Sequence, residues 1–231
     1  NLVALHQTKI KRLLAYSSIA HAGYMIMATS VILGVRGADG PLSVDEVTGA
    51  ILFYLGVYTF MNLGAFTVAA IIGQQTGSED ITDYAALIRR SPVLAVLMAL
   101  FLLSLFGMPG LGGFMGKMLI GVTMIKLGGW GFFLVGVLLV NTLLSLYYYM
   151  RPVYYMVLQP DTEDRRPVLP SVSALAMLAV CAVTLVLTGI LPQQPSALLR
   201  EFAGVGAVAE AAADDRTEAD QVAAATRGGQ P

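Results

Sequence analysis

Long, uninterrupted runs of apolar residues recur along this 231-residue chain and constrain its fold more than any other feature. A helix needs about 20 mainly apolar residues to cross the hydrocarbon core of a bilayer, and runs above about 18 residues are candidate spans. Only 13% of the residues are charged, against about 25% in a typical soluble domain. A β-barrel would require alternating apolar residues rather than continuous runs, so the sequence predicts an all-α polytopic membrane protein.

The apolar runs predict about five full transmembrane helices and the end of another. We expect the spans at about 10–35, 47–73, 92–126, 131–157 and 171–191. Residues 1–9 are predicted to end a preceding helix, and residues 192–231 to form a polar C-terminal tail that is partly disordered. A short surface helix is expected near Asp83 to Arg89. Because the chain begins at Asn1 rather than at a methionine, we expect it to be a fragment that lacks upstream sequence.

The basic residues predict the orientation of the bundle, because cytoplasmic loops carry an excess of lysine and arginine. If each predicted span crosses the membrane once, the following basic residues lie on one side: Lys9, Lys11, Arg12, Arg89, Arg90, Arg151, Arg165 and Arg166. The short loops on the other side receive only Arg36 and Lys126. We therefore expect the first side to be cytoplasmic and the C-terminal tail to lie outside. The net charge of −1 gives no reason to expect nucleic-acid binding.

The third apolar run, 92–126, is too long for one straight transmembrane helix. As a single helix its 35 residues would extend about 52 Å, against about 30 Å for the hydrocarbon core. Near its middle lie residues that interrupt helices, namely Gly107, Pro109, Gly110, Gly112 and Gly113. The sequence therefore predicts a helix that is broken around Gly107–Gly113.

Lys117 follows the predicted break and is the first candidate for chemistry. None of the predicted spans contains Asp or Glu, so a lysine there is conspicuous. An ionisable residue inside a span is by default a functional hypothesis, and unwound backbone is tolerated only where it faces protein or a wet cavity. Because burial disfavours the charged ammonium, Lys117 could release and regain a proton. The alternative is a lysine that snorkels to the interface, which is the expectation for Lys126 beside the Gly128–Gly129 turn.

Polar side chains form stripes on the faces of three predicted spans. With i, i+4, i+7 or similar spacing, these are Ser17, His21 and Tyr24, then Tyr54, Tyr58 and Asn62, and then Asn141, Ser145 and Tyr148. Such stripes can hold a chain of hydrogen bonds or waters, and histidine suits a relay because its charge changes near neutral pH. The second and third stripes, each taken alone, are more typical of polar contacts that join helices than of a pathway. His21 is as typical of a histidine bonded to a neighbouring helix as of a relay. Lys11 and Arg12, at the start of a span, are either relay candidates or headgroup anchors.

Motifs for redox chemistry and nucleotide hydrolysis are absent from the sequence. It has no phosphate-binding loop, no dinucleotide fingerprint and no paired histidine ligands. Cys181 is the only cysteine, so an intrachain disulfide or a cysteine metal cluster is excluded. We therefore expect no cofactor site, no metal site and no complete active site in this chain.

Four stretches together resemble one family of membrane proteins. They are QTKIKRLLAYSSIAHAGYM, YLGVYTFMNLGAF, LLSLFGMPGLGGFMGKM and NTLLSLYYYMRPVYYM. They resemble the antiporter-like subunits of proton-pumping NADH–quinone oxidoreductase (respiratory complex I). The run Tyr147–Tyr149 and the NLGAF stretch favour the C-terminal part of subunit N, whereas similar stretches also occur in Mrp-type antiporters. Two residues depart from the usual pattern at the break: Met108 replaces an isoleucine, and Gly110 a common second proline.

The resemblance implies a fold of fourteen helices in two inverted repeats, of which this chain would hold most of the second repeat and the last helix. It implies that Lys117 is the lysine of the second broken helix, and that Lys11 and His21 lie along a central polar axis. Lys117, His21 and Lys11 would form a proton relay in a non-redox, proton-translocating subunit. The alternatives are an Mrp-type cation/proton antiporter subunit and a purely structural membrane subunit.

The resemblance also implies partners and a location. NADH, FMN, iron–sulfur clusters and quinone would be bound by partner subunits, with none of them in this chain. The expected partners are other membrane subunits, including sister antiporter-like subunits, together with the lipid bilayer, protons and water. The expected location is the bacterial plasma (inner) membrane.

Overall fold

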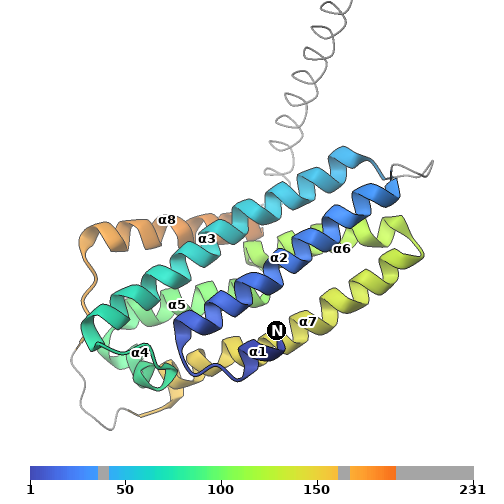
Figure 1. The fold of residues 1–231 in the computed structure, drawn as a ribbon. Helices are drawn as coiled ribbons and strands as arrows, with labels where there is room; N and C mark the ends of the chain where they lie inside the picture. The colour runs from blue at the N-terminus through green and yellow to red at the C-terminus, as the bar shows by residue number, and fades with distance from the viewer. Residues whose placement is uncertain (36–41, 161–166, 191–231) are drawn as a thin grey trace, which may run out of the picture.

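A computed structural model describes residues 1–35, 42–160 and 167–190, and helices dominate these residues (Figure 1). In chain order they are α1 (Leu2–Leu5), α2 (Ile10–Val35), α3 (Val44–Thr76), the 3₁₀ turn η1 (Ile81–Tyr84), α4 (Leu87–Arg90), α5 (Pro92–Phe106), α6 (Gly112–Leu127), α7 (Trp130–Leu158) and α8 (Val172–Ile190). Of the described helices, α2, α3, α7 and α8 have the length and apolar composition needed to cross a bilayer. The predicted all-α membrane bundle is confirmed, while the number of crossings stays a prediction. The predicted tail lies outside the described residues.

α5 and α6 occupy the region where the broken span is predicted. With 15 and 16 residues they are each only about 22–24 Å long, so neither crosses a core of about 30 Å alone. The predicted limits of the break need one correction: α6 begins at Gly112, so Gly112 and Gly113 belong to its first turn. These glycines serve close packing, because a Cβ on Gly113 would overlap the carbonyl oxygen of Ser104 in α5.

α3 is the central helix and packs against α2, α5, α6 and α8, as Figure 1 shows. Its start is capped by Ser43, whose hydroxyl accepts a hydrogen bond from the N–H of Glu46 at 3.2 Å. Asp45 and Glu46 lie in the first turn, where the helix dipole favours acidic groups. Gly77, with a φ of 73°, ends the helix in the left-handed conformation that glycine adopts easily.

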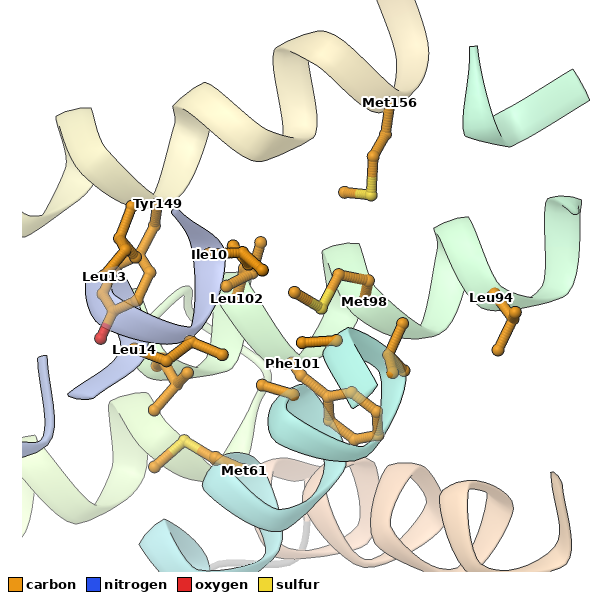
Figure 2. Packing of buried hydrophobic residues seen from close by; sticks show 14 of the residues in the cluster. Ile10, Leu13, Leu14, Met61, Leu94, Met98, Phe101, Leu102, Tyr149 and Met156 are labelled. Atoms are coloured by element: carbon orange, nitrogen blue, oxygen red, sulfur yellow. The ribbon is translucent and has the colours of Figure 1, made fainter. Parts of the chain in front are cut away.

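The apolar core lies where α2, α3, α5 and α7 meet. Figure 2 shows Leu13 of α2, Met61 of α3, Phe101 of α5 and Tyr149 of α7 converging there, and all four are fully buried. The outer surface also carries large apolar side chains, such as Trp130, which is 79% exposed. Apolar outer faces are expected of helices that face lipid or other membrane subunits.

The connection from α3 to α5 consists of two short turns rather than the one helix predicted near Asp83 to Arg89. η1 and α4 are separated at Ala86, whose φ is 51°. The N–H of Ala86 donates to the carbonyl of Tyr155 in α7 at 3.2 Å. This contact with α7 holds Ala86 outside the helical conformation and so interrupts the predicted helix.

Basic residues gather at one end of the bundle. Figure 1 places the start of α2, the short helix α4 and the end of α7 together at this end. The described basic residues on these segments or beside them are Lys9, Lys11, Arg12, Arg89, Arg90 and Arg151. Lys126 comes from the other end, where it pairs with Glu46. Arg36, Arg165 and Arg166 lie outside the described residues. That the basic end faces the cytoplasm stays a prediction.

We expect Gly64→Ala to destabilise the bundle, because a Cβ on Gly64 of α3 would overlap the buried ring of Phe101. Overpacking of a closed core typically costs about 1–3 kcal/mol. Gly56→Ala is the matched control on the same helix, since a Cβ there has open space around it. The midpoint of thermal unfolding should fall for Gly64→Ala and stay or rise for Gly56→Ala. Equal midpoints for the two variants would contradict this packing.

Candidate functional site

The end of α5 leaves backbone carbonyl groups without helical partners. Gly107, with a φ of 97°, and Met108 both donate their N–H groups back to the carbonyl of Leu103, at 3.0 and 2.9 Å. This left-handed cap ends the helix sharply. The carbonyls of Leu105 and Phe106 lie in the last turn, where no following helical residue can donate to them.

Lys117 provides the donors for these two carbonyls. Its Nζ lies 2.9 Å from the carbonyl oxygen of Leu105 and 2.7 Å from that of Phe106. The negative end of the α5 dipole favours a cation at this position. The side chain runs beside Gly107, where an added Cβ would lie 3.3 Å from the lysine Cδ. With 6% of its surface exposed, Lys117 points into the bundle and does not snorkel outward.

Glycines on α6 bring Lys117 close to neighbouring helices. The N–H of Gly113 donates to the hydroxyl of Ser104 at 3.3 Å, which joins the start of α6 to the end of α5. A Cβ on Gly116, immediately before Lys117, would lie 2.5 Å from the ring of Tyr54 in α3. The sequence therefore places glycines where α6 packs closely against the end of α5 and the ring of Tyr54.

His21 is fully enclosed and bonds two tyrosines from other helices. It is 1% exposed, with Nδ1 2.5 Å from the hydroxyl of Tyr54 in α3 and Nε2 3.2 Å from the hydroxyl of Tyr149 in α7. The Tyr149 hydroxyl also bonds the hydroxyl of Ser17. Tyr58 stacks on the imidazole with ring centroids 4.9 Å apart. His21 therefore both joins helices and belongs to a continuous set of groups that can donate and accept protons.

Tyr24 lies between Lys117 and His21. The Lys117 Nζ is 5.4 Å from the centroid of the Tyr24 ring, and the His21 and Tyr24 rings are 5.6 Å apart, edge to face. Among the hydrogen bonds of the described residues, none joins Lys117 to His21 directly. Proton exchange between them would therefore need bridging water, which commonly links polar groups more than about 3.5 Å apart.

Lys11 is not brought to this cluster. It lies at the start of α2, is 38% exposed and pairs with Glu79 at 2.7 Å. Because Lys11 and His21 are separated by ten helical positions, they lie about 15 Å apart along α2. Arg12 is exposed at the same end.

Of the other predicted stripe residues, Tyr148 lies beside Tyr149, with ring centroids 4.5 Å apart, and so reaches the edge of the His21 hydrogen bonds. Tyr148 donates to the Asn1 side chain at 2.9 Å, and the amide of Asn1 donates to the Asn141 side chain at 2.8 Å. Ser145 donates to the carbonyl of Thr142 in its own helix at 2.6 Å. Asn62 is half-buried on α3, about one helical turn after Tyr58 in the sequence.

Residues 1–145 match the family described as NADH:quinone oxidoreductase/Mrp antiporter, TM. The chain belongs to this family. It is 38% identical over 194 residues to NADH-quinone oxidoreductase subunit N of Desulforamulus reducens, an alignment that covers 83% of this chain and 37% of the relative. The chain thus spans little more than a third of the length of this curated relative. The predicted resemblance to subunit N is confirmed.

Two solved structures contain chains of similar fold. A chain of respiratory complex I from Thermus thermophilus matches with a TM-score of 0.68 and 32% identity, over 86% of this chain and 42% of that one. A chain of the Mrp complex from a Dietzia species matches with a TM-score of 0.62 and 20% identity, over 85% of this chain and 21% of that one. The second likeness concerns the fold alone. The description of the matched family itself names both NADH:quinone oxidoreductase and Mrp antiporter.

Tyr149 is the main site residue that the sequence reasoning missed. It lies in the run Tyr147–Tyr149, of which the sequence prediction places Tyr148 on the polar face. The spacing i, i+4, i+8 from Asn141 through Ser145 leads to Tyr149, so helical periodicity contained the signal. No sequence pattern could indicate the two backbone carbonyls that receive the Lys117 ammonium.

We expect the Lys11–Glu79 pair to stabilise the basic end in a pH-dependent way. The hydrogen bond from Lys11, and the charges of Lys11, Lys9 and Arg12, hold the pKa of Glu79 below its usual range. A lowered carboxyl pKa contributes stability above the unfolded-state pKa, and this stability is lost as the pH falls through the folded-state pKa.

The measurement is a double-mutant cycle of Glu79→Gln and Lys11→Met, followed by the midpoint of thermal unfolding against pH. The two substitutions should be coupled near neutral pH and become additive in acid. Because both side chains are more than one third exposed, the coupling should be small and weakened by salt. Coupling that persists unchanged through the acidic range would contradict the ion pair.

Proposed function

We propose that this chain is a proton-translocating membrane subunit of an NADH–quinone oxidoreductase, in which Lys117 loads and unloads a proton. The observation that best supports this function is the buried Lys117 ammonium at the helix break, one tyrosine ring away from the buried His21. Buried ionisable groups at interrupted helices are typical of ion pathways. The chain itself would be non-redox, and partner subunits would bind NADH, FMN, iron–sulfur clusters and quinone.

Lys117 would act as the group whose charge changes. When protonated, its ammonium is stabilised by the carbonyls of Leu105 and Phe106 and by the α5 dipole. A change of charge or conformation in a partner subunit would weaken this stabilisation, and the proton would leave through water beside Tyr24. Reprotonation would restore the two hydrogen bonds.

His21 would carry the proton across three helices. A proton that arrives at one ring nitrogen can be matched by release from the other, so the imidazole exchanges tautomers without a lasting charge. The hydroxyls of Tyr54, Tyr149 and Ser17 extend the path on both sides of the ring. Lys11 would stand at the basic end of this path, where Glu79 holds it.

An Mrp-type cation/proton antiporter subunit is the second candidate. Membership of a family whose description names both kinds of protein favours it. The two functions differ in partners and in cation dependence. An oxidoreductase subunit should translocate protons together with redox partners at a constant sodium concentration. An antiporter subunit should not translocate protons under that condition. In either case we place the chain in a bacterial plasma membrane with the basic end cytoplasmic and the C-terminal tail outside.

We expect Lys117→Ala, made in the intact complex, to lower the number of protons translocated per electron without a matching loss of quinone reduction. Lys126→Ala is the matched control, because Lys126 is partly exposed and pairs with Glu46 at the surface. The ratio should fall for Lys117→Ala and stay unchanged for Lys126→Ala. Lys117→Arg keeps the charge but does not readily deprotonate, so it should also lower the ratio. A normal ratio in assembled Lys117→Ala complex would exclude the relay.

We expect Tyr149→Phe to slow proton transfer, because it keeps the buried ring and removes the hydroxyl that joins Ser17 to His21. Positioned groups that transfer protons typically contribute about 10²–10⁴-fold, and replacement by water would recover part of this, so we expect a loss of about tenfold. Tyr147→Phe is the control, since Tyr147 is 61% exposed on the same helix. The proton flux at fixed driving force measures the effect, and equal fluxes for both variants would contradict the path.

A further inference from the structure

The last turn of α8 presses against the break between α5 and α6. A Cβ on Gly189 would lie 2.5 Å from the Cα of Leu111 and 2.6 Å from the carbonyl carbon of Gly110. A Cβ on Gly112, the first residue of α6, would overlap the hydroxyl of Thr188 and lie 3.3 Å from the carbonyl oxygen of Leu185 in α8. It would also lie 3.0 Å from Cγ1 of Val57 in α3. The end of α8 therefore touches the three residues at which the chain re-enters a helix.

This contact depends on shape rather than on hydrogen bonds. The Thr188 hydroxyl donates to carbonyls of its own helix, 2.7 Å from that of Thr184 and 3.3 Å from that of Leu185. A glycine lies on each side of the contact, Gly112 on α6 and Gly189 on α8. Close packing of small residues lets two backbones meet at one fixed position, and an added methyl group must displace one of them.

The position of the α6 start determines where Lys117 lies. Gly112 and Lys117 belong to the same short helix, whereas the carbonyls that receive the ammonium belong to α5. A displacement of α6 relative to α5 therefore changes both hydrogen bonds of the ammonium. α8 contacts the start of α6, whereas the Lys117 ammonium donates its hydrogen bonds to the end of α5.

We propose that Thr188 and Gly189 are positioning residues for Lys117: the end of α8 fixes the start of α6 and thereby holds the ammonium on the two carbonyls. This inference rests on the proposed proton-translocating function. It assigns to α8 a role in coupling, although α8 contributes no ionisable group to the site.

The test is a set of single substitutions in the intact complex, with protons translocated per electron as the readout. Gly112→Ala should reduce the ratio at least twofold while quinone reduction and the amount of assembled complex stay near normal. Thr188→Ala should also lower the ratio, because it removes the side chain that packs on the start of α6. Gly189→Ala should lower it as well, because a Cβ there would lie 2.5 Å from the Cα of Leu111. Gly136→Ala, which has open space around it, is the control.

The outcomes separate the two proposals. A normal ratio in the assembled Thr188→Ala and Gly189→Ala complexes, or a parallel loss of quinone reduction and assembly, would overturn the positioning role. If Gly112→Ala does not assemble, Thr188→Leu tests the same contact from α8, where Thr188 is half-buried. A normal ratio in the assembled Thr188→Leu complex overturns the inference. Lys117→Ala is measured in parallel. A normal ratio in the Lys117→Ala complex overturns the proposed function itself. A lowered ratio in that complex, together with normal ratios for Gly112→Ala and Thr188→Leu, overturns the positioning role alone.

Discussion

The hydrogen bonds from the Lys117 ammonium to the last carbonyls of α5 are the interaction on which the rest of the site depends. A charged group inside a membrane protein is costly unless it is paired or hydrated, and so is an unsatisfied backbone carbonyl. The interrupted helix and the lysine therefore stabilise each other. Without the break there would be no free carbonyls, and without the lysine the carbonyls of Leu105 and Phe106 would lack a donor.

Close backbone packing makes this arrangement possible. Gly113 lets α6 pass the end of α5, Gly116 lets it pass Tyr54, and Gly189 lets α8 reach the break. Tyrosines then fill the space beside Lys117 and enclose His21, so polar groups from α2, α3 and α7 meet in the interior. The apolar outer faces of the same helices suit lipid or neighbouring subunits.

Much of the fold was predictable because hydrophobic run length and helix-breaking residues act locally. The long apolar helices and the interruption between α5 and α6 follow from such local patterns, whereas these patterns leave the burial of Lys117 open against a snorkelling lysine. Contacts between distant residues were not predictable: the pairing of Lys11 with Glu79 removes Lys11 from the interior, and the choice of Tyr149 over Tyr148 depends on the rotation of α7. Gly112 and Gly113 were assigned to the break because sequence alone does not distinguish a glycine that breaks a helix from one that permits close packing.

Proton exchange between Lys117 and His21 is the central claim, and ordered water is its most direct test. An experimental structure of the intact complex, at a resolution that resolves water, should contain water molecules that connect the Lys117 Nζ past Tyr24 to the hydroxyls bonded to His21. Water in this gap, hydrogen-bonded to the ammonium, is the expected result. A dry gap filled by side chains, with Lys117 bonded only to the carbonyls of Leu105 and Phe106, would contradict a relay through these residues.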